Sequence, residues 1–535
     1  MTIPINLFFW TLCIVPIILL LVLMIKFQWG ASKAAPFTLV VTIVLGMLFF
    51  KANGKVLTSE LLKAGWNSTG IILVIISAIL LYEVGSEAKA FDTLNVLFRK
   101  LAPNELIRVL MIGIVFASFL QGITGFGVPV LITAPLLLNI GVAPVYAVII
   151  PLLGHSWAGT FGTLALGWNA LLIQTGIEDK SLILHTAIYA SLFLFILTIL
   201  FSFIITFFYG RWQGVKKGFI AVAMITLIQG GGQLIFSTFN PELAAFIPSA
   251  ISLLAIIGLS KTPLYREPWQ IEDSKIMTRV EIDPIKKTNQ KLTTTQALLP
   301  YYLVTGISLL ILLIPPITNF LGSFSFGPSF SQTETSYGVI NPAIEQYAPL
   351  TPFTHASMFL LASSLITYLY YRKAGLIKTR SLLQLIKRAF KKALSPSIAV
   401  LSLLSISRVM AGTGQTFVLA QGISAVLQEN YVFIAPFIGL LGSFITGSNM
   451  SSNILFGDFQ MQVSEFIGLK TAAILGAQTG GGGIGTSIAP GNIILGTTTA
   501  GILGSEGKVL IKIIPYTLAV AAIFGVILFL DYKFI

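Results

Sequence analysis

Apolar runs of about 20 residues recur from one end of this 535-residue chain to the other. Each run is long enough to cross the hydrocarbon core of a bilayer as a helix. Only 10% of the residues are charged and the mean hydropathy is +0.89, whereas soluble domains carry about 25% charged residues. The sequence therefore predicts an all-α polytopic membrane protein that crosses the plasma membrane many times.

The basic residues gather in short loops between the apolar runs. The formal net charge is +13, but this placement is typical of the positive-inside bias of membrane proteins rather than of nucleic-acid binding. Residues 371–392 contain eight Lys or Arg and no acid, so we expect them in the cytoplasm, together with the linker 261–295 and the loop 85–104. Residues 322–352 contain no base and are expected outside. The run 7–25 has its basic flank after it, which predicts a retained first span with its N-terminus outside.

A sparse internal repeat appears at an offset near 325 residues. The matched positions are Gly122 with Gly447, Gly141 with Gly468, Gly176 with Gly501, and Glu83 with Arg408. The predicted span 66–84 runs inward and its counterpart 397–415 runs outward, so the two copies are expected to be inverted. Inverted repeats with interrupted helices are typical of secondary transporters.

We accordingly predict an inverted-repeat secondary transporter with about 12–14 membrane segments, some of them interrupted or re-entrant. The predicted units are N-terminal spans (1–65), a first repeat (66–210), connecting spans with cytoplasmic loops (211–394), and a second repeat (395–535).

Four segments rich in Gly, Pro, Ser, Thr and Asn interrupt the apolar runs, two in each repeat: 121–129, 153–163, 446–453 and 478–492. Backbone groups freed there cannot stay unpaired in hydrocarbon, so such segments face protein or a water-filled cavity. Half-helix N-termini present free N–H groups with a partial positive charge, which suits a carboxylate. The alternative is that the glycines only allow helices to pack closely.

We predict that these segments form a substrate site near the bilayer midplane, where Ser and Asn add hydroxyl and amide groups. The candidate substrate-binding residues are Gln121, Gly122, Thr124, Gly125, Gly127, His155, Arg408, Ser448, Asn449, Ser451, Ser452 and Asn453.

Ionisable residues at membrane depth are functional candidates because their burial is costly. Arg408 is predicted to hold the substrate carboxylate, with Glu83 as counter-charge or proton carrier. The alternative, of equal weight, is a structural Glu83–Arg408 pair that locks the repeats together. His155 is suited to carry a proton near neutral pH, with a hydrogen-bonded structural role as the alternative. Asp458 joins Glu83 and His155 as a candidate for ion coupling.

Nothing in the sequence indicates catalysis. No cluster of Ser, His and an acid and no metal-ligand spacing is present, so we expect no enzyme activity, no metal site and no cofactor. The glycines at 480–485 lack the Lys-Ser/Thr of a phosphate-binding loop. The single cysteine, Cys13, excludes a disulfide within the chain.

The interrupted segments and their flanks read FLQGITGFGVPV with HSWAGTFGTLALGW, and FITGSNMSSNILFG with GGGGIGTSIAPGN. These two pairs of stretches resemble the lactate permease family. The resemblance extends along nearly the whole chain and implies secondary uptake of L-lactate and related 2-hydroxymonocarboxylates driven by a proton gradient. Where many members carry Glu in the first motif this chain has Gln121, and where many carry Asp in the serine-rich motif it has Asn449.

The residues and the resemblance together predict a permease for L-lactate and related short 2-hydroxymonocarboxylates, with the proton as coupling ion. Its expected partners are the small carboxylate, the coupling ion and the lipid bilayer, without nucleic acid, and association into a homo-oligomer stays open. The alternatives are sodium-coupled transport of another small organic anion and a passive anion channel.

Overall fold

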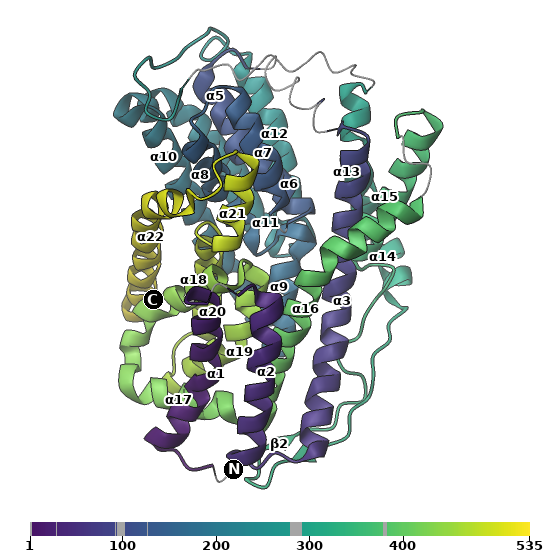
Figure 1. Cartoon of the computed structure of the whole chain (residues 1–535), viewed down its shortest axis with the longest axis vertical. Helices are drawn as coiled ribbons and strands as arrows, with labels where there is room; N and C mark the ends of the chain where they lie inside the picture. Colours follow the sequence, from purple (N-terminus) through teal and green to yellow (C-terminus); the bar gives the residue numbers. More distant parts are fainter. Residues whose placement is uncertain are drawn as a thin grey trace.

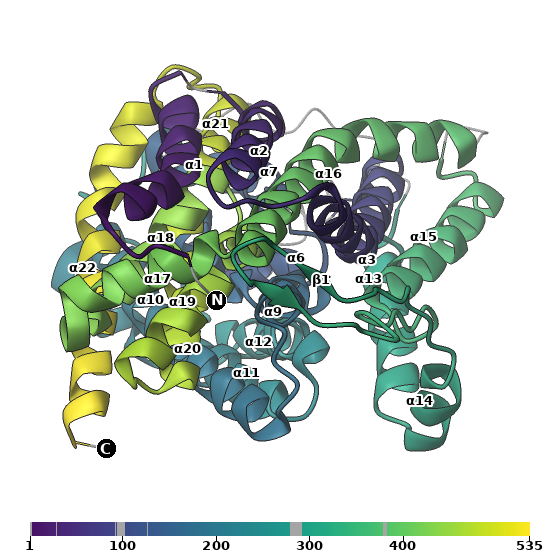
Figure 2. The same ribbon diagram turned by 90° about the horizontal axis from the view of Figure 1, so that it is seen from below.

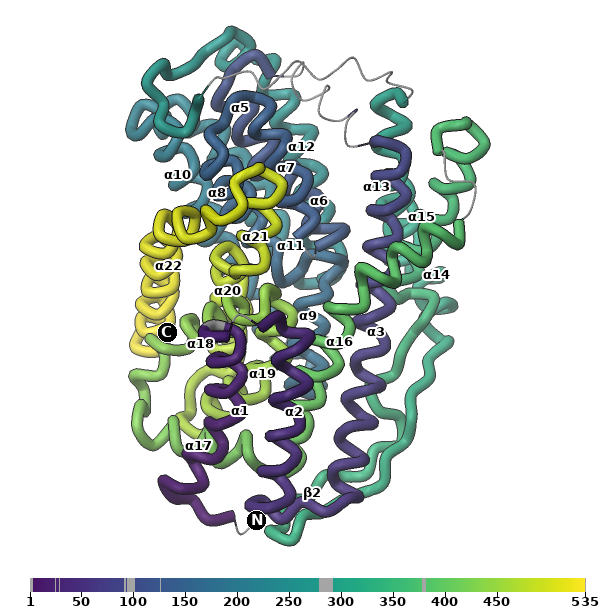
Figure 3. The backbone as a smooth tube through the Cα atoms, viewed as in Figure 1, coloured from purple at the N-terminus to yellow at the C-terminus, as the bar shows by residue number. Residues whose placement is uncertain are grey.

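Most of the helices of the computed structural model run along its long axis (Figures 1 and 3). It describes residues 3–27, 29–90, 93, 102–125, 127–278, 292–377 and 382–534. Several basic residues of the loops 85–104, 261–295 and 371–392 lie outside these ranges: Arg99, Lys100, Arg279, Lys286, Lys287, Lys291, Lys378 and Arg380.

The first half of the chain contains α1 (Leu7–Ile25), α2 (Ala31–Leu48), α3 (Gly54–Glu87), α5 (Glu105–Leu110), α6 (Ala117–Ile123), α7 (Val128–Asn139), α8 (Pro144–His155), α9 (Gly162–Thr175), α10 (Lys180–Thr226), α11 (Gly232–Ser237) and α12 (Phe246–Ser260). Short π-helical or 3-10 segments join some of these: η1 (Met111–Phe116), η2 (Ser156–Gly159), η3 (Leu227–Gly231) and η4 (Pro241–Leu243).

The second half contains α13 (Thr294–Leu312), α14 (Pro315–Gly322), α15 (Ala356–Lys373), α16 (Leu382–Thr413), α17 (Gln415–Leu427), η5 (Gln428–Asn430), α18 (Tyr431–Thr446), α19 (Asn449–Ile467), α20 (Thr471–Thr486), α21 (Pro490–Thr499) and α22 (Glu506–Phe534). Two short strands, β1 (Thr333–Glu334) and β2 (Ile340–Asn341), pair antiparallel in the loop between α14 and α15.

Polar side chains just before the helices explain where several of them begin. The side chains of Asn6, Asn53 and Asn104 accept hydrogen bonds from first-turn amides of α1, α3 and α5. Asp179 caps α10 in the same way, and Thr293 forms a capping box with Gln296 at α13. Such caps satisfy backbone donors that the helix itself leaves unpaired.

Ten helical stretches of the described residues are long and apolar enough to cross a membrane, or eleven with the bent pair Pro144–Gly159 and Gly162–Thr175. One of the ten, Lys180–Ser237, has 58 residues. It folds back on itself at Gly210 and Arg211, where the backbone is not helical, and Gly214 then packs against Thr206. This stretch is long enough for two crossings, which brings the count nearer to the expected 12–14 segments.

Loops that were expected on one side of the membrane lie together at one end of the molecule. At this end Tyr209 donates to Glu105 at 2.7 Å, and the amide of Glu105 donates to the Trp269 carbonyl at 3.0 Å. At the other end Asn53 donates to the Glu334 carbonyl at 3.0 Å. Figure 1 shows α5 and α12 at the first end and the N-terminus with β2 at the second. This grouping agrees with the charge-based alternation of the loops.

Helices α3 and α16 pack side by side in opposite directions. Arg388, near the start of α16, pairs with Glu87 at the end of α3 at 2.7 Å, and Arg408, near the end of α16, pairs with Glu60 near the start of α3 at 2.5 Å. Opposite directions are what two inverted copies require. The predicted boundaries at 65/66 and 394/395 fall inside these two continuous helices, and the division into repeats stays a prediction.

Viewed from below, α13, α14 and α15 lie on one side, away from α1, α17 and α22 (Figure 2). Helices α6 and α9 from the first half of the chain and α19 from the second lie between α22 and α13, and α9 packs against α19. This placement brings the breaks of both halves to one place.

Candidate functional site

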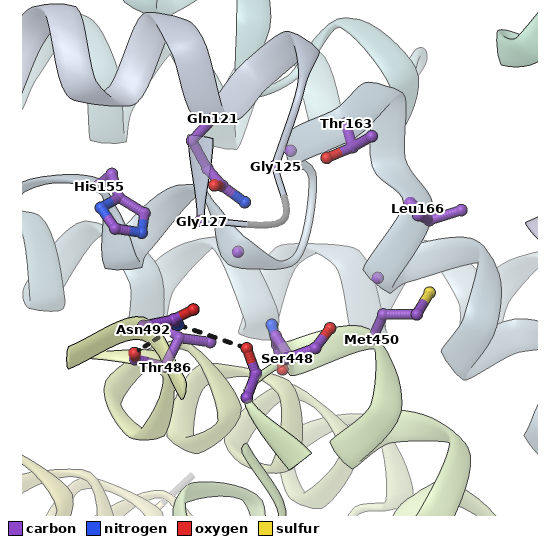
Figure 4. Close-up of a pocket in the computed structure, with 15 residues that line it drawn as sticks. Gln121, Gly125, Gly127, His155, Thr163, Leu166, Ser448, Met450, Thr486 and Asn492 are labelled. Atoms are coloured by element: carbon purple, nitrogen blue, oxygen red, sulfur yellow. Dashed lines mark hydrogen bonds between the residues drawn. The ribbon is translucent and has the colours of Figure 1, made fainter. Parts of the chain in front are cut away.

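All four interrupted segments line one small cavity of about 60 Å³, which exceeds the roughly 10–15 Å³ needed for a single water. Figure 4 shows Gln121, His155 and Thr163 on one wall, with Ser448, Thr486 and Asn492 on the facing wall. The complete lining is Gln121, Gly125, Gly127, His155, Gly159, Gly162, Thr163, Leu166, Gly167, Gly447, Ser448, Asn449, Met450, Thr486 and Asn492. The prediction that these distant segments meet is therefore confirmed.

The first break separates α6 from α7. Gly125 and Gly127 have φ of 58° and 79°, a left-handed region that glycine adopts at little cost. Gly127 is the N-cap of α7, and Pro129 lies in the first turn, where its missing N–H costs no helical hydrogen bond. The N-terminus of α7 therefore begins at the cavity wall.

The break between α18 and α19 has the same design. Gly447 ends α18 with φ of 80°, and Ser448 is the N-cap of α19. Within the described residues, the Ser448 side chain accepts no hydrogen bond from the first-turn amides of α19. Both α7 and α19 thus direct N-termini at one cavity. Their partial positive charges favour an anion there, although the described lining contains no Lys or Arg.

The segment 153–163 forms a tight turn at the cavity. Helix α8 ends at His155, a 3-10 turn follows, and Thr163, Leu164 and Ala165 then all adopt left-handed conformations with φ of 51°, 54° and 62°. Nδ1 of His155 lies in hydrogen-bond contact with the carbonyl of Pro151. The Nδ1 proton is therefore held by the helix, and the second ring nitrogen is left for other partners.

The predicted break at 478–492 is confined to a shorter stretch. Helix α20 continues through the glycines up to Thr486, and the chain departs from a helix only before Pro490. A Cβ on Gly481 would lie 2.0 Å from the Pro436 carbonyl, and one on Gly485 would lie 2.2 Å from the Leu440 carbonyl. These two glycines therefore serve the close packing of α20 on α18, the alternative explanation considered above.

A buried hydroxyl and amide network joins the walls just behind the cavity. Nδ2 of Asn449 donates to Oγ1 of Thr160 at 2.8 Å, and Thr160 shares a hydrogen bond of 2.9 Å with Thr479. Nδ2 of Asn453 donates to Oγ1 of Thr479 at 2.8 Å and to the Gly167 carbonyl at 3.0 Å. The network spans both halves of the chain, so it sets how the two sets of broken helices are aligned.

Replacing Thr479 with valine keeps the shape of this side chain and removes the shared hydroxyl. We expect a loss of about 1–3 kcal/mol in the free energy of unfolding, because buried partners are left unsatisfied. Thermal unfolding in detergent measures the change. Thr133→Val is the control, since among the described residues the Thr133 hydroxyl donates only to the Pro129 carbonyl of its own helix. Equal stability of the two variants would contradict the network's role.

Several predicted residues lie near the cavity without lining it. Gly122 packs its backbone against Phe246, and Thr124 donates back to the Leu120 carbonyl at 2.8 Å. Ser452 donates to the Gly439 carbonyl at 2.8 Å, so it joins α19 to α18. Ser451 and Asn453 are buried on α19. These residues support the wall, whereas Gln121, Gly125, Gly127, His155, Ser448 and Asn449 line it.

The Glu83–Arg408 pair considered as an alternative above does not form. Glu83 pairs with Lys392, and Arg408 donates to Oε2 of Glu60 at 2.8 and 2.5 Å. Glu83 and Arg408 occupy matching positions in the sequence repeat, each near the end of its helix. Because α3 and α16 are antiparallel, these two ends lie at opposite ends of the helix pair. Asp458 accepts a hydrogen bond from Gln462 at 2.9 Å. Arg408, Glu83 and Asp458 are not among the residues that line the cavity.

The sequence reasoning missed the buried ion cluster around Glu60. Its carboxylate also accepts from Lys63 at 2.7 Å, and the exposed fractions of the Glu60 and Lys63 side chains are 0% and 2%. In the sequence, Glu60 and Lys63 lie near the start of a predicted helix, where charged residues are usually exposed to solvent. Sequence analysis also missed nine of the described lining residues: Gly159, Gly162, Thr163, Leu166, Gly167, Gly447, Met450, Thr486 and Asn492. All but Leu166 and Gly167 lie within the four interrupted segments, so membership of those segments was the signal that could have found them.

Comparison with known proteins gives a consistent result over nearly the whole chain. The family described as L-lactate permease matches residues 10–535. The L-lactate permease of Halalkalibacterium halodurans is 24% identical over 520 residues, which is 97% of this chain and 94% of that protein. The glycolate permease GlcA of Escherichia coli is 24% identical over 551 residues, covering 97% and 94% of the two chains.

A solved transporter structure also aligns with most of the chain. It is the Alcanivorax borkumensis YdaH transporter, described as having an unusual topology, with 12% identity, a TM-score of 0.46 and coverage of 98% of this chain and 97% of that one.

Proposed function

The chain belongs to the L-lactate permease family, a family of multi-pass membrane transporters, and we propose that it carries L-lactate and related short 2-hydroxymonocarboxylates across the plasma membrane together with protons. The single observation that carries the proposal is the cavity shared by the four interrupted segments, at which the N-termini of α7 and α19 meet.

The cavity chemistry suits a small oxygenated anion. The amides at the start of α19, beside Ser448, receive the carboxylate through backbone N–H groups and the helix dipole. The side-chain amides of Gln121 and Asn492 supply partners for a 2-hydroxyl. Nδ2 of Asn492 is already bonded to the carbonyls of Gly447 and Thr486, at 3.3 and 3.0 Å, so its oxygen is the atom that accepts.

A site without a fixed cation favours release as well as binding. Neutral donors hold the anion only moderately, and a transported species must leave the site again. Because Gln121 and Asn449 are neutral, they do not oppose the substrate's charge. We place the coupling proton on His155, the ionisable side chain among the described lining residues.

The proposal is tested by uptake of radiolabelled L-lactate into proteoliposomes under an imposed proton or sodium gradient. We expect saturable uptake that accumulates substrate under an inward proton gradient. Accumulation driven only by sodium would replace the proton with sodium, and uptake insensitive to both gradients would indicate a passive channel. Absence of saturable uptake of any short 2-hydroxy acid would refute the assignment.

His155→Ala is expected to abolish lactate accumulation driven by a proton gradient while leaving exchange of internal for external lactate. The proton carrier is lost, but the helix N-termini that bind the carboxylate remain. The two modes are measured in the same liposomes. His185→Ala is the matched control, because His185 is exposed and bonds only to Ser181 in its own helix among the described residues. Unchanged proton-driven accumulation in His155→Ala would show that the proton is carried elsewhere.

A further inference from the structure

A second cavity of about 470 Å³ lies between α3, α9 and the loop that precedes α15. Its walls include Trp66 and Asn67 of α3, Asn169 of α9, and residues 348–351, 354 and 355 of the loop. The lining residues 348–351 belong to the base-free segment 322–352 that charge places outside. The cavity therefore lies in the outer part of the molecule.

Polar groups make this outer cavity suitable for water. Nδ2 of Asn67 donates to the Tyr347 hydroxyl at 2.8 Å, and Nε1 of Trp66 donates to the Ala348 carbonyl at 2.9 Å, so α3 holds the loop in place. Oδ1 of Asn67 is buried without a hydrogen-bond partner among the described residues. A space of this size, with the polar side chains of Asn67 and Asn169 in its lining, is roomy and polar enough to hold water.

One residue, Leu166, lines both the outer cavity and the site cavity. Figure 4 shows Leu166 at the edge of the site, beyond Thr163. Leu166 is thus the described residue at which the linings of the two cavities meet.

The backbone just before Leu166 has an unusual conformation. Thr163, Leu164 and Ala165 are three consecutive non-glycine residues with positive φ, a region that L-amino acids rarely occupy and never as a regular helix. The turn is held by hydrogen bonds from Ala165 to the Phe161 carbonyl at 2.9 Å and from Trp168 to the Thr160 carbonyl at 2.8 Å. Such conformations cluster at ligand clamps and switch regions.

We propose that the outer cavity is the path by which the small carboxylate reaches the site from outside, and that Leu166, on its left-handed turn, is the residue that closes this path. The structure described is the closed form at Leu166. When the turn relaxes to ordinary backbone conformations, Leu166 moves and the two cavities join. Glu242 also lines the outer cavity. The inference rests on the proposed function for the identity of the solute.

Thiol labelling tests the path without any transport measurement. Cys13 is the single cysteine and is buried, so Cys13→Ser gives a background in which introduced cysteines report alone. A membrane-impermeant, negatively charged methanethiosulfonate is applied outside intact cells. We expect Asn169→Cys, in the outer cavity, to react readily. Leu171→Cys, fully buried on the same helix and outside both lining sets, is the unreactive control.

The gate is tested by a site cysteine. Ser448→Cys is expected to react slowly from outside, and adding Leu166→Ala should raise its rate by about tenfold or more, as when a rarely populated open state becomes dominant. Leu166→Val, which keeps most of the side chain, should raise the rate less and serves as a second variant if the alanine variant does not fold. An unchanged Ser448→Cys rate in both variants, or labelling of Asn169→Cys only from the inner side, would overturn the proposal.

The outcomes separate this inference from the proposed function. Labelling as expected in a protein that takes up no 2-hydroxy acid would retain the path and refute the substrate. Lactate uptake without the labelling pattern would retain the substrate and refute the path.

Discussion

Replacing Glu60 with alanine is expected to remove most of the folded protein from the membrane. Lys63 and Arg408 both depend on the Glu60 carboxylate, which is fully buried. Removing one partner from a buried ion pair leaves uncompensated charge and typically costs about 3–5 kcal/mol. The yield of monodisperse protein in detergent and its thermal unfolding measure the effect.

Glu87→Ala is the matched control for this prediction. Glu87 lies on the same helix, and its partner Arg388 has a side chain that is 48% exposed. Exposed pairs contribute only about 0–1 kcal/mol. Equal stability of the Glu60 and Glu87 variants would contradict a stabilising role for the buried cluster.

Arg408→Ala separates the two roles considered for that arginine. Glu60 keeps Lys63 as its partner in this variant, so the expected stability loss is smaller than for Glu60→Ala. Since Arg408 does not line the cavity, the protein that folds should retain uptake with a similar KM. A well-folded Arg408→Ala protein without uptake would instead support the hypothesis that Arg408 binds the substrate.

Gly125→Ala is expected to reduce lactate uptake by roughly tenfold or more. Gly125 has φ of 58°, a conformation that costs an L-residue roughly 1–2 kcal/mol, and each 1.4 kcal/mol corresponds to a factor of about ten. The added Cβ would also lie 2.3 Å from Oγ1 of Thr163. Thr163 cannot easily yield, because it belongs to the left-handed turn that follows α8. Initial uptake rates, normalised to folded protein, provide the measurement.

Two further variants distinguish the effect of backbone strain at Gly125 from the effect of the steric clash with Thr163. Gly447→Ala has the same backbone strain, with φ of 80°, but a Cβ there meets nothing within 4 Å, so its loss should be smaller. Adding Thr163→Ala to Gly125→Ala removes the hydroxyl and should restore part of the uptake. Equal losses at Gly125 and Gly447 would show that crowding against Thr163 is unimportant.

The repeat found at an offset near 325 shows both the strength and the limit of sequence comparison. The matched glycines Gly141 and Gly468 have φ of 89° and 72°, and Gly176 and Gly501 have φ of 65° and 69°. Glycine adopts positive φ at little cost, so the requirement for it at these turns can be seen in the sequence. The match of Glu83 with Arg408 did not become a contact, because charged partners depend on which helix lies opposite.

Hydropathy, loop charge and the placement of Gly and Pro were sufficient to establish a polytopic helical protein, the grouping of its loops and the four places where its helices are interrupted. These properties depend on segments of about 20 residues and on how each meets lipid or water. Tertiary packing alone determines that Asn449 meets Thr160 across 289 residues and that Arg408 meets Glu60 across 348. It also places Leu166 between two cavities. Such contacts depend on how helices cross and how closely glycines let them approach, and neither is encoded in the period of a single segment.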